Sequence, residues 1–191
     1  MQSNQKNFLN KKLLSKLILT LPLISPLIPF DLNPAKAGYE IQWNDDSGFK
    51  KLKWHQKNPK KRGKNKIFFF YRPSDRNTGL LKINIKVPDN FKSTITPKKV
   101  TLCRVNIGGY DSKTKCLENI AADVEVTNKG KNVDIFPLAP LPSDKEAYAI
   151  VFKVTNPQRA GLYQFNSFGK SSGTIPVSSY LGSWTIKIDQ Q

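Results

Sequence analysis

Apolar residues recur at every second position through most of the chain from Leu80 onward. In the stretch "LKINIKV", Leu81, Ile83, Ile85 and Val87 share one face, and the polar residues between them share the other. The same alternation returns at 101–107, 122–127, 131–136, 148–154, 161–168 and 180–188. A period of two is the side-chain period of a half-buried β-strand. No twelve-residue window in this part of the chain has a convincing helical period, so an all-β domain is expected.

One segment is apolar at consecutive positions. "KIFFFY", from Lys66 to Tyr71, predicts a strand that is buried on both faces. Together these segments make seven or eight short strands, separated by clusters of Pro, Gly, Asn, Asp and Ser. Asn128-Lys129-Gly130 is expected to form a hairpin turn between two of them. This spacing predicts an antiparallel β-sandwich, immunoglobulin-like in architecture, with a barrel as the alternative.

The first 37 residues have a different pattern. Basic residues without an acid precede a fourteen-residue apolar run, Leu17–Phe30, and small residues follow at Ala35 and Ala37. This order is typical of a secretory signal peptide cut before Gly38. The alternative, a membrane anchor, would need about 20 apolar residues, and the run contains three prolines. We therefore expect an exported protein without a transmembrane helix after processing, located in the periplasm, the outer envelope or the extracellular space.

The sequence then divides into three parts. Residues 1–37 are the expected signal peptide, residues 38–66 a basic N-terminal segment, and residues 67–191 the β-sandwich domain. The two cysteines, Cys103 and Cys116, are expected to form a disulfide, which export permits. Free thiols and half of a metal site remain alternatives. The metal alternative is weak because there is no C-x-x-C spacing and the chain has a single histidine.

Charge is concentrated in one place. The formal net charge is +17, and Lys50–Lys66 contains nine basic residues and no acid. Its candidate polyanion-binding residues are Lys50, Lys51, Lys53, Trp54, Lys57, Lys60, Lys61, Arg62, Lys64 and Lys66. In an exported protein the matching partners are acidic polysaccharide, lipopolysaccharide or an anionic lipid surface, and chromosomal nucleic acid is not expected. Trp54 could stack on a ligand or anchor the core. A solvated loop or linker is the alternative for the whole stretch.

Candidate catalytic residues do not form a constellation. Ser171 lies in "GKSSG", but no helical pattern follows it, and the only histidine, His55, lies upstream in a different chain order. Calcium binding by "NDDSG", Asn44–Gly48, lacks the full spacing of a calcium loop. We therefore expect a non-enzymatic domain without a cofactor or a metal. The alternative is a hydrolase that acts on cell-wall material or polysaccharide.

Three stretches resemble a known family. "NPQRAGLYQFNSFG" and "SSYLGSWTIKI" are similar to the closing signature of an uncharacterised family of exported cyanobacterial proteins, and "IFFFYRPSDRNTGLLKINIKVPDNF" is similar to its earlier strand. Members consist of a signal peptide and one domain of unknown function. The likeness covers roughly Phe68 to Ile188, and the Lys-rich stretch departs from it. The resemblance implies an exported β-rich domain, and its motifs consist of turn and core residues.

Overall fold

The computed structural model describes residues 48–172 and 177–190. The expected signal peptide, with Ala35, Ala37 and Gly38 at its cleavage site, lies outside the described residues, as does most of the "NDDSG" stretch. Among the residues that are described, no helix has the length and apolar character needed to cross a membrane.

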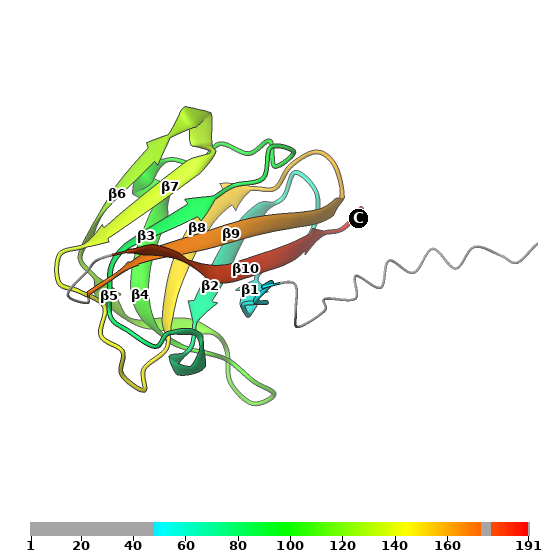
Figure 1. Ribbon diagram of the computed structural model, residues 1–191. Helices are drawn as coiled ribbons and strands as arrows, with labels where there is room; N and C mark the ends of the chain where they lie inside the picture. Colours follow the sequence, from blue (N-terminus) through cyan, green and yellow to red (C-terminus); the bar gives the residue numbers. More distant parts are fainter. Residues whose placement is uncertain (1–47, 173–176, 191) are drawn as a thin grey trace, which may run out of the picture. The chain divides into compact units, whose positions relative to one another are not determined.

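The described residues form two antiparallel five-stranded sheets, so the predicted β-sandwich is confirmed (Figure 1). The first, called the β2 sheet, has the order β1-β2-β8-β4-β5, and the second, called the β9 sheet, has the order β10-β9-β3-β7-β6. The strands are β1 Trp54–Gln56, β2 Lys64–Tyr71, β3 Leu80–Lys86, β4 Val100–Asn106, β5 Lys115–Ile120, β6 Ala122–Thr127, β7 Asn132–Pro137, β8 Tyr148–Thr155, β9 Gly161–Ser171 and β10 Ser178–Ile188. The predicted hairpin at Asn128–Gly130 joins β6 to β7.

The main core lies between the two sheets. Phe69 of β2 is at its centre, with ring centroids 5.0 Å from Phe165 and 4.8 Å from Trp184. Most of the predicted inward positions are confirmed, including Ile83 and Ile85, which are fully buried. The prediction for Leu81 is wrong, because a β-bulge between Leu80 and Lys82 shifts the alternation; Leu80 is buried and Leu81 is 38% exposed. An extra residue at a bulge reverses the facing of its neighbour.

Strand β2 is buried on both faces, as its apolar run predicted. Ile67, Phe69 and Tyr71 face the main core. Phe68 and Phe70 point to the outer face, where they form a second apolar cluster with Val105 and Val151, among others. Burial of apolar surface stabilises the folded state by about 25 cal/mol per Å². A strand that is buried on both faces contributes this stabilisation on each of them. The double burial predicted for this apolar run therefore holds over most of Lys64–Tyr71.

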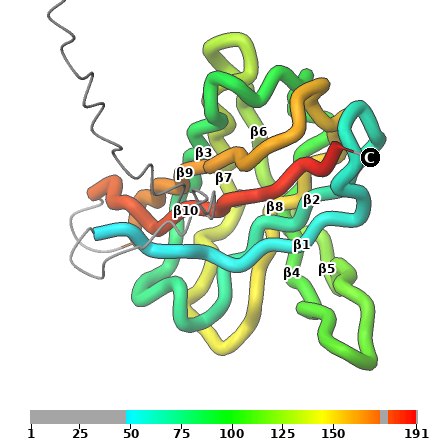
Figure 2. The backbone as a smooth tube through the Cα atoms, turned by 90° about the vertical axis from the view of Figure 1, so that its right-hand side faces the viewer, coloured from blue at the N-terminus to red at the C-terminus, as the bar shows by residue number. Residues whose placement is uncertain are grey.

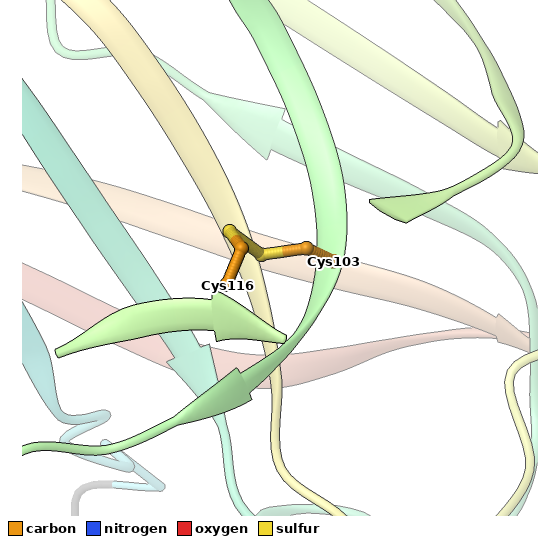
Figure 3. The surroundings of a disulfide bond; sticks show 2 residues. All are labelled: Cys103 and Cys116. Carbon is orange, nitrogen blue, oxygen red and sulfur yellow. A yellow bond between two sulfur atoms is a disulfide. The ribbon is translucent and has the colours of Figure 1, made fainter. Parts of the chain in front are cut away.

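The disulfide between Cys103 and Cys116 is confirmed. Cys103 lies on β4 and Cys116 on the edge strand β5, with Cα atoms 5.7 Å apart and side chains that point toward each other (Figure 3). Cys103 belongs to the second apolar cluster, and Cys116 and Ile107 pack against it. The bridge therefore fastens the edge strand, and the loop that precedes it, to the outer face of the β2 sheet.

The basic segment is part of the sandwich. Leu52 is fully buried, and its amide donates to the Ser183 carbonyl of β10 at 2.8 Å. The chain then pairs as β1 with β2, so it passes from one sheet to the other and closes the side of the sandwich (Figure 2). Later in the segment, Lys60 forms a bridge with Asp189. The structured part of the chain thus reaches back beyond the domain boundary expected at residue 67.

Candidate functional site

Basic side chains of the segment alternate with inward ones. Exposed Lys53, His55 and Lys57 line the outer face of β1, while Leu52 and Trp54 point inward against the main core. Trp54 is partly buried there, which fits the core-anchor alternative rather than an exposed stacking surface. Successive side chains of a strand point to opposite faces. Only about half of the side chains in this basic stretch therefore lie on any one surface.

Three lysines lie side by side on the outer face of the β2 sheet, and we call them the lysine row: Lys57, Lys66 and Lys153. The amide of Lys57 donates to the Lys66 carbonyl at 3.1 Å, and Lys66 stands directly opposite Lys153 across β2 and β8. Neighbouring strands lie about 4.8 Å apart, so the row crosses three strands within roughly 10 Å. Lys64 lies two residues along β2 from Lys66, opposite Thr155.

The lysine row is not neutralised by acids. Within 48–172 and 177–190, none of its three lysines forms a salt bridge. The Nζ atom of Lys66 instead lies 4.9 Å from the centre of the Phe68 ring. Burial, and then the positive charges of Lys57 and Lys153, lower the pKa of Lys66 below its usual value. Like charges that face each other across strands are destabilising. A bound anion would therefore reduce the repulsion between the lysines on this face.

A groove of about 440 Å³ adjoins the row at β1. Its walls include His55 and Lys57 on one side and Ser112 and Lys113 of the β4–β5 loop on the other. β1 and β5 are opposite edges of the sheet, and the β4–β5 loop nevertheless shares the groove with β1. Burial, and then the charge of Lys57, lower the pKa of His55. The groove thus presents two ammonium groups and an imidazole beside a serine hydroxyl.

The most basic part of the stretch is a turn held by buried amides. Asn65 donates to Oδ1 of Asn156 at 3.0 Å, and Asn156 donates to the carbonyls of Asn58 and Lys60, both at 2.8 Å. Both amide side chains are buried, and such groups stabilise a loop when all their partners are present. This arrangement positions the turn with Lys60, Lys61 and Arg62 beside Asn156, where Lys60 also bridges Asp189 after β10.

The remaining predicted residues are used structurally or point elsewhere. The Nζ atom of Lys50 donates to the Asp75 carbonyl at 2.8 Å. Lys51 is exposed and bridges Ser183 through its backbone. The structure therefore brings together Lys57, Lys64 and Lys66 from the predicted set and adds Lys153, which sequence reasoning missed. Lys153 lies about ninety positions from Lys66 in the sequence. One indication in the sequence that it faces outward is its polar position in the alternating run of β8.

The candidate catalytic residues lie apart. Ser171 is the last residue of β9 and pairs with Leu80, so it belongs to a strand of the β9 sheet and not to a strand-to-helix elbow. His55 lies on β1 of the other sheet. In the part of the chain that the structure describes, no group of three or more His, Cys, Asp or Glu side chains is placed to hold a metal ion.

A second groove lies on the opposite outer face, and sequence reasoning did not identify it. It has a volume of about 610 Å³ and is lined on β3 and β9 by Lys82, Lys86, Phe168 and Lys170, among others. The Nζ atom of Lys86 lies 5.0 Å from the centre of the Phe168 ring. Lys82 stands directly opposite Lys170. Both outer faces of the sandwich therefore carry a pair of lysines in direct cross-strand register.

Several solved structures are similar to this chain at low sequence identity. BslA, a bacterial hydrophobin, has 18% identity over 75% of this chain and 97% of its own, with a TM-score of 0.47. The collagen-binding domain of a Staphylococcus aureus adhesin has 10% identity over 70% and 95%, with a TM-score of 0.39. The human F-spondin reeler domain has 9% identity over 78% and 100%, with a TM-score of 0.37. No curated protein matches the chain.

The comparison with protein families gives one match that covers most of the chain. The family described as "Protein of unknown function (DUF2808)" matches residues 45–188. The match begins within the basic segment and before Lys50, so the lysine row, the turn and both grooves lie within it. The expectation of a family domain of unknown function is thereby confirmed, and its extent is longer than the resemblance from Phe68 onward indicated. The chain belongs to the DUF2808 family.

Proposed function

We propose that this protein is an exported, non-catalytic β-domain that binds envelope polyanions through the outer face of the β2 sheet. The observation that carries the proposal is the lysine row, in which Lys66 directly faces Lys153 with Lys57 beside it. A fold that places like charges in register loses stability. A bound polyanion would reverse that loss, since each cation near an anionic surface contributes about 1 kcal/mol at most.

The shape of the row favours an extended ligand. Its cations are spread across three strands, and Lys64 and the His55–Lys113 groove extend it in two directions. A single small anion could reach only one or two of these groups, whereas a polymer or a surface with repeated charges could meet all of them. The ligands of this kind in an envelope are acidic polysaccharide, lipopolysaccharide phosphate and anionic lipid headgroups.

Export is supported by two features. The N-terminal 37 residues have the basic, apolar and small-residue order of a signal peptide, and the cysteines form a bridge of the kind that persists in oxidising compartments. The resemblance to exported cyanobacterial proteins agrees with this assignment. Ser171 and His55, two candidate residues considered for a hydrolase, belong to different sheets. Together these observations favour binding over catalysis.

The test compares two variants with equal charge changes. The row variant carries Lys57→Gln, Lys66→Gln and Lys153→Gln, and the control carries Gln at three exposed lysines elsewhere, Lys92, Lys129 and Lys145. Protein exported by the expression host is titrated against immobilised polyuronate, lipopolysaccharide and anionic vesicles at increasing salt. We expect the row variant to lose at least about tenfold in affinity and to show a shallower salt dependence.

The control variant should retain nearly wild-type affinity. Equal losses in the two variants would show that net charge alone, and not the row, attracts the ligand. Binding that stays unchanged up to about 0.5 M salt would exclude an electrostatic mechanism altogether. The N-terminus of the exported protein is sequenced in the same preparation, and any residue other than Gly38 would overturn the proposed cleavage site.

A further inference from the structure

The groove on the outer face of the β9 sheet has the composition of a sugar site. Its floor is the Phe168 ring, which stands opposite Asn84 on β3 and opposite Tyr180 on β10. The rings of Phe168 and Tyr180 have centroids 5.7 Å apart. Asn84 and Ser178 add an amide and a hydroxyl to the lining. Aromatic surfaces combined with a few polar groups are typical of sites that hold a polar ring by one face.

Cations surround this floor. Lys86 approaches the Phe168 ring, and Lys170 is exposed at the next outward position of β9. Lys82 faces Lys170 across the strands; its Nζ atom is 2.8 Å from Asp134 and 4.8 Å from the centre of the Phe136 ring. Three ammonium groups thus meet one carboxylate. Within the described ranges, neither Lys86 nor Lys170 forms a salt bridge.

The position of the groove favours a polymer over a membrane as its ligand. The lysine row and the Phe168 groove lie on the outer faces of the two sheets, which point in opposite directions. A flat lipid surface can contact only one of these faces at a time, whereas separate polymer chains can occupy both. The aromatic floor also favours a sugar, because a ring C–H face can stack on Phe168 while an acidic substituent meets Lys86 or Lys170.

We infer that the Phe168 groove is a second site, for an acidic sugar residue of a polysaccharide, and that one molecule therefore bridges two polysaccharide chains. The inference rests on the proposed function, since the lysine row supplies the other contact. When one of two linked sites is occupied, the effective concentration of ligand at the other site rises. Two weak sites on one domain can therefore join two chains without any further contact. The protein would then be a cross-linker of acidic polysaccharide.

The experiment uses two probes. Trigalacturonate, which is too short to span the molecule from face to face, is titrated by calorimetry to count sites. Polygalacturonate is mixed with protein over a range of ratios, and static light scattering measures cross-linking. Wild type should bind two trimers per molecule and should give a scattering maximum at an intermediate ratio, with loss of scattering when protein is in excess.

The groove variants are Phe168→Ala and, with the ring intact, Lys86→Gln combined with Lys170→Gln. Each should bind one trimer and should still bind the polymer, but its scattering maximum should fall at least fivefold. The charge-matched control, with Gln at Lys92 and Lys129, should scatter like wild type. Thermal unfolding of each variant confirms the fold; if Phe168→Ala is unfolded, the double lysine variant decides.

The outcomes separate the two proposals. Wild-type scattering in both groove variants, or a single trimer site in wild type that the row variant loses, would overturn the second site while leaving the row intact. If the groove variants lose one trimer site but the row variant still binds like wild type, the proposed function would be overturned instead. Clustering of phosphatidylglycerol vesicles that depends on Phe168 would show that the groove accepts lipid headgroups, and would overturn its assignment to sugar.

Discussion

Replacing Lys153 by Glu should make the protein more stable and a weaker binder of polyanions. Lys153 directly faces Lys66 across β8 and β2, and Lys57, the residue that follows β1, lies beside Lys66 on its other side. The Lys153→Glu change converts a like-charge pair into an opposite-charge pair at the same register position. No core contact is lost, because the side chain at position 153 is exposed on the outer face.

The expected gain follows from the spacing of the strands. Directly opposed residues have Cβ atoms about 5 Å apart, and two unit charges about 6 Å apart in water interact by about 0.7 kcal/mol. Reversing the sign of one charge changes this term by about 1.4 kcal/mol before screening. Salt and side-chain freedom reduce such exposed interactions, so we expect about 0.5–1 kcal/mol. That gain corresponds to a rise in Tm of about 1–4 °C.

The measurement is urea unfolding at low and at high salt, with Lys145→Glu as the control. Position 145 lies in an exposed loop, so its substitution makes the same change in net charge without a cross-strand partner. We expect the gain at Lys153 to shrink toward that of the control at about 1 M salt, where the screening length is about 3 Å. Equal stabilisation by both substitutions at low salt, or destabilisation by Lys153→Glu, would refute the repulsion argument.

Three further predictions concern the elements that hold this face together. Leu52→Ala should lower the free energy of unfolding by about 2–5 kcal/mol, because it leaves a cavity at the closed side of the sandwich, whereas Lys53→Ala should change it by less than about 0.5 kcal/mol; chemical denaturation compares them. Replacing both bridged cysteines by Ala should cost about 3 kcal/mol in the chain-entropy model and should speed hydrogen exchange in β5. The pKa of His55 is lowered in the folded state, so stability should decrease as pH falls from about 6.5 through the folded pKa and level off below it. The single imidazole signal in the NMR spectrum gives that pKa directly; bound polyanion should raise it, and an unchanged value would place the ligand away from the groove.

The sequence predicted the facing of most strands because burial requires period two. Phe152 and Trp184 lie in the core and belong to the alternating runs at 148–154 and 180–188, and the double burial of β2 followed from its unbroken apolar run. Leu81 was assigned to the wrong face because a bulge has no signature in an alternating stretch. The role of Trp54 stayed open between ligand stacking and core anchoring, because Leu52 and Trp54 stand among lysines and the charge obscured the alternation that these two residues carry.

The candidate sites were harder to predict because they depend on register. Lys66 and Lys153 are 87 positions apart in the sequence, and only the pairing of β2 with β8 brings them together. The same holds for Lys82 and Lys170 on the other face. A local charge count selected the turn at Lys60–Arg62, where cations are densest along the chain. In the folded protein, the lysine row includes fewer of the predicted residues than the turn does. Its lysines, however, are held at defined cross-strand positions.

The two lysine pairs also link stability to function. The Lys66–Lys153 pair opposes folding, whereas Lys82 of the other pair is compensated in part by Asp134 at 2.8 Å. The fold tolerates these pairs because the inter-sheet core around Phe69 and the closed side at Leu52 supply apolar burial that does not depend on the outer faces. A polyanion that binds only the folded state adds stability according to its concentration, by about 2.7 kcal/mol at one hundred times the dissociation constant. That gain exceeds the repulsion estimated for one pair. The protein would therefore be least stable when free and most stable when both faces are occupied, which is the state in which it would join two chains.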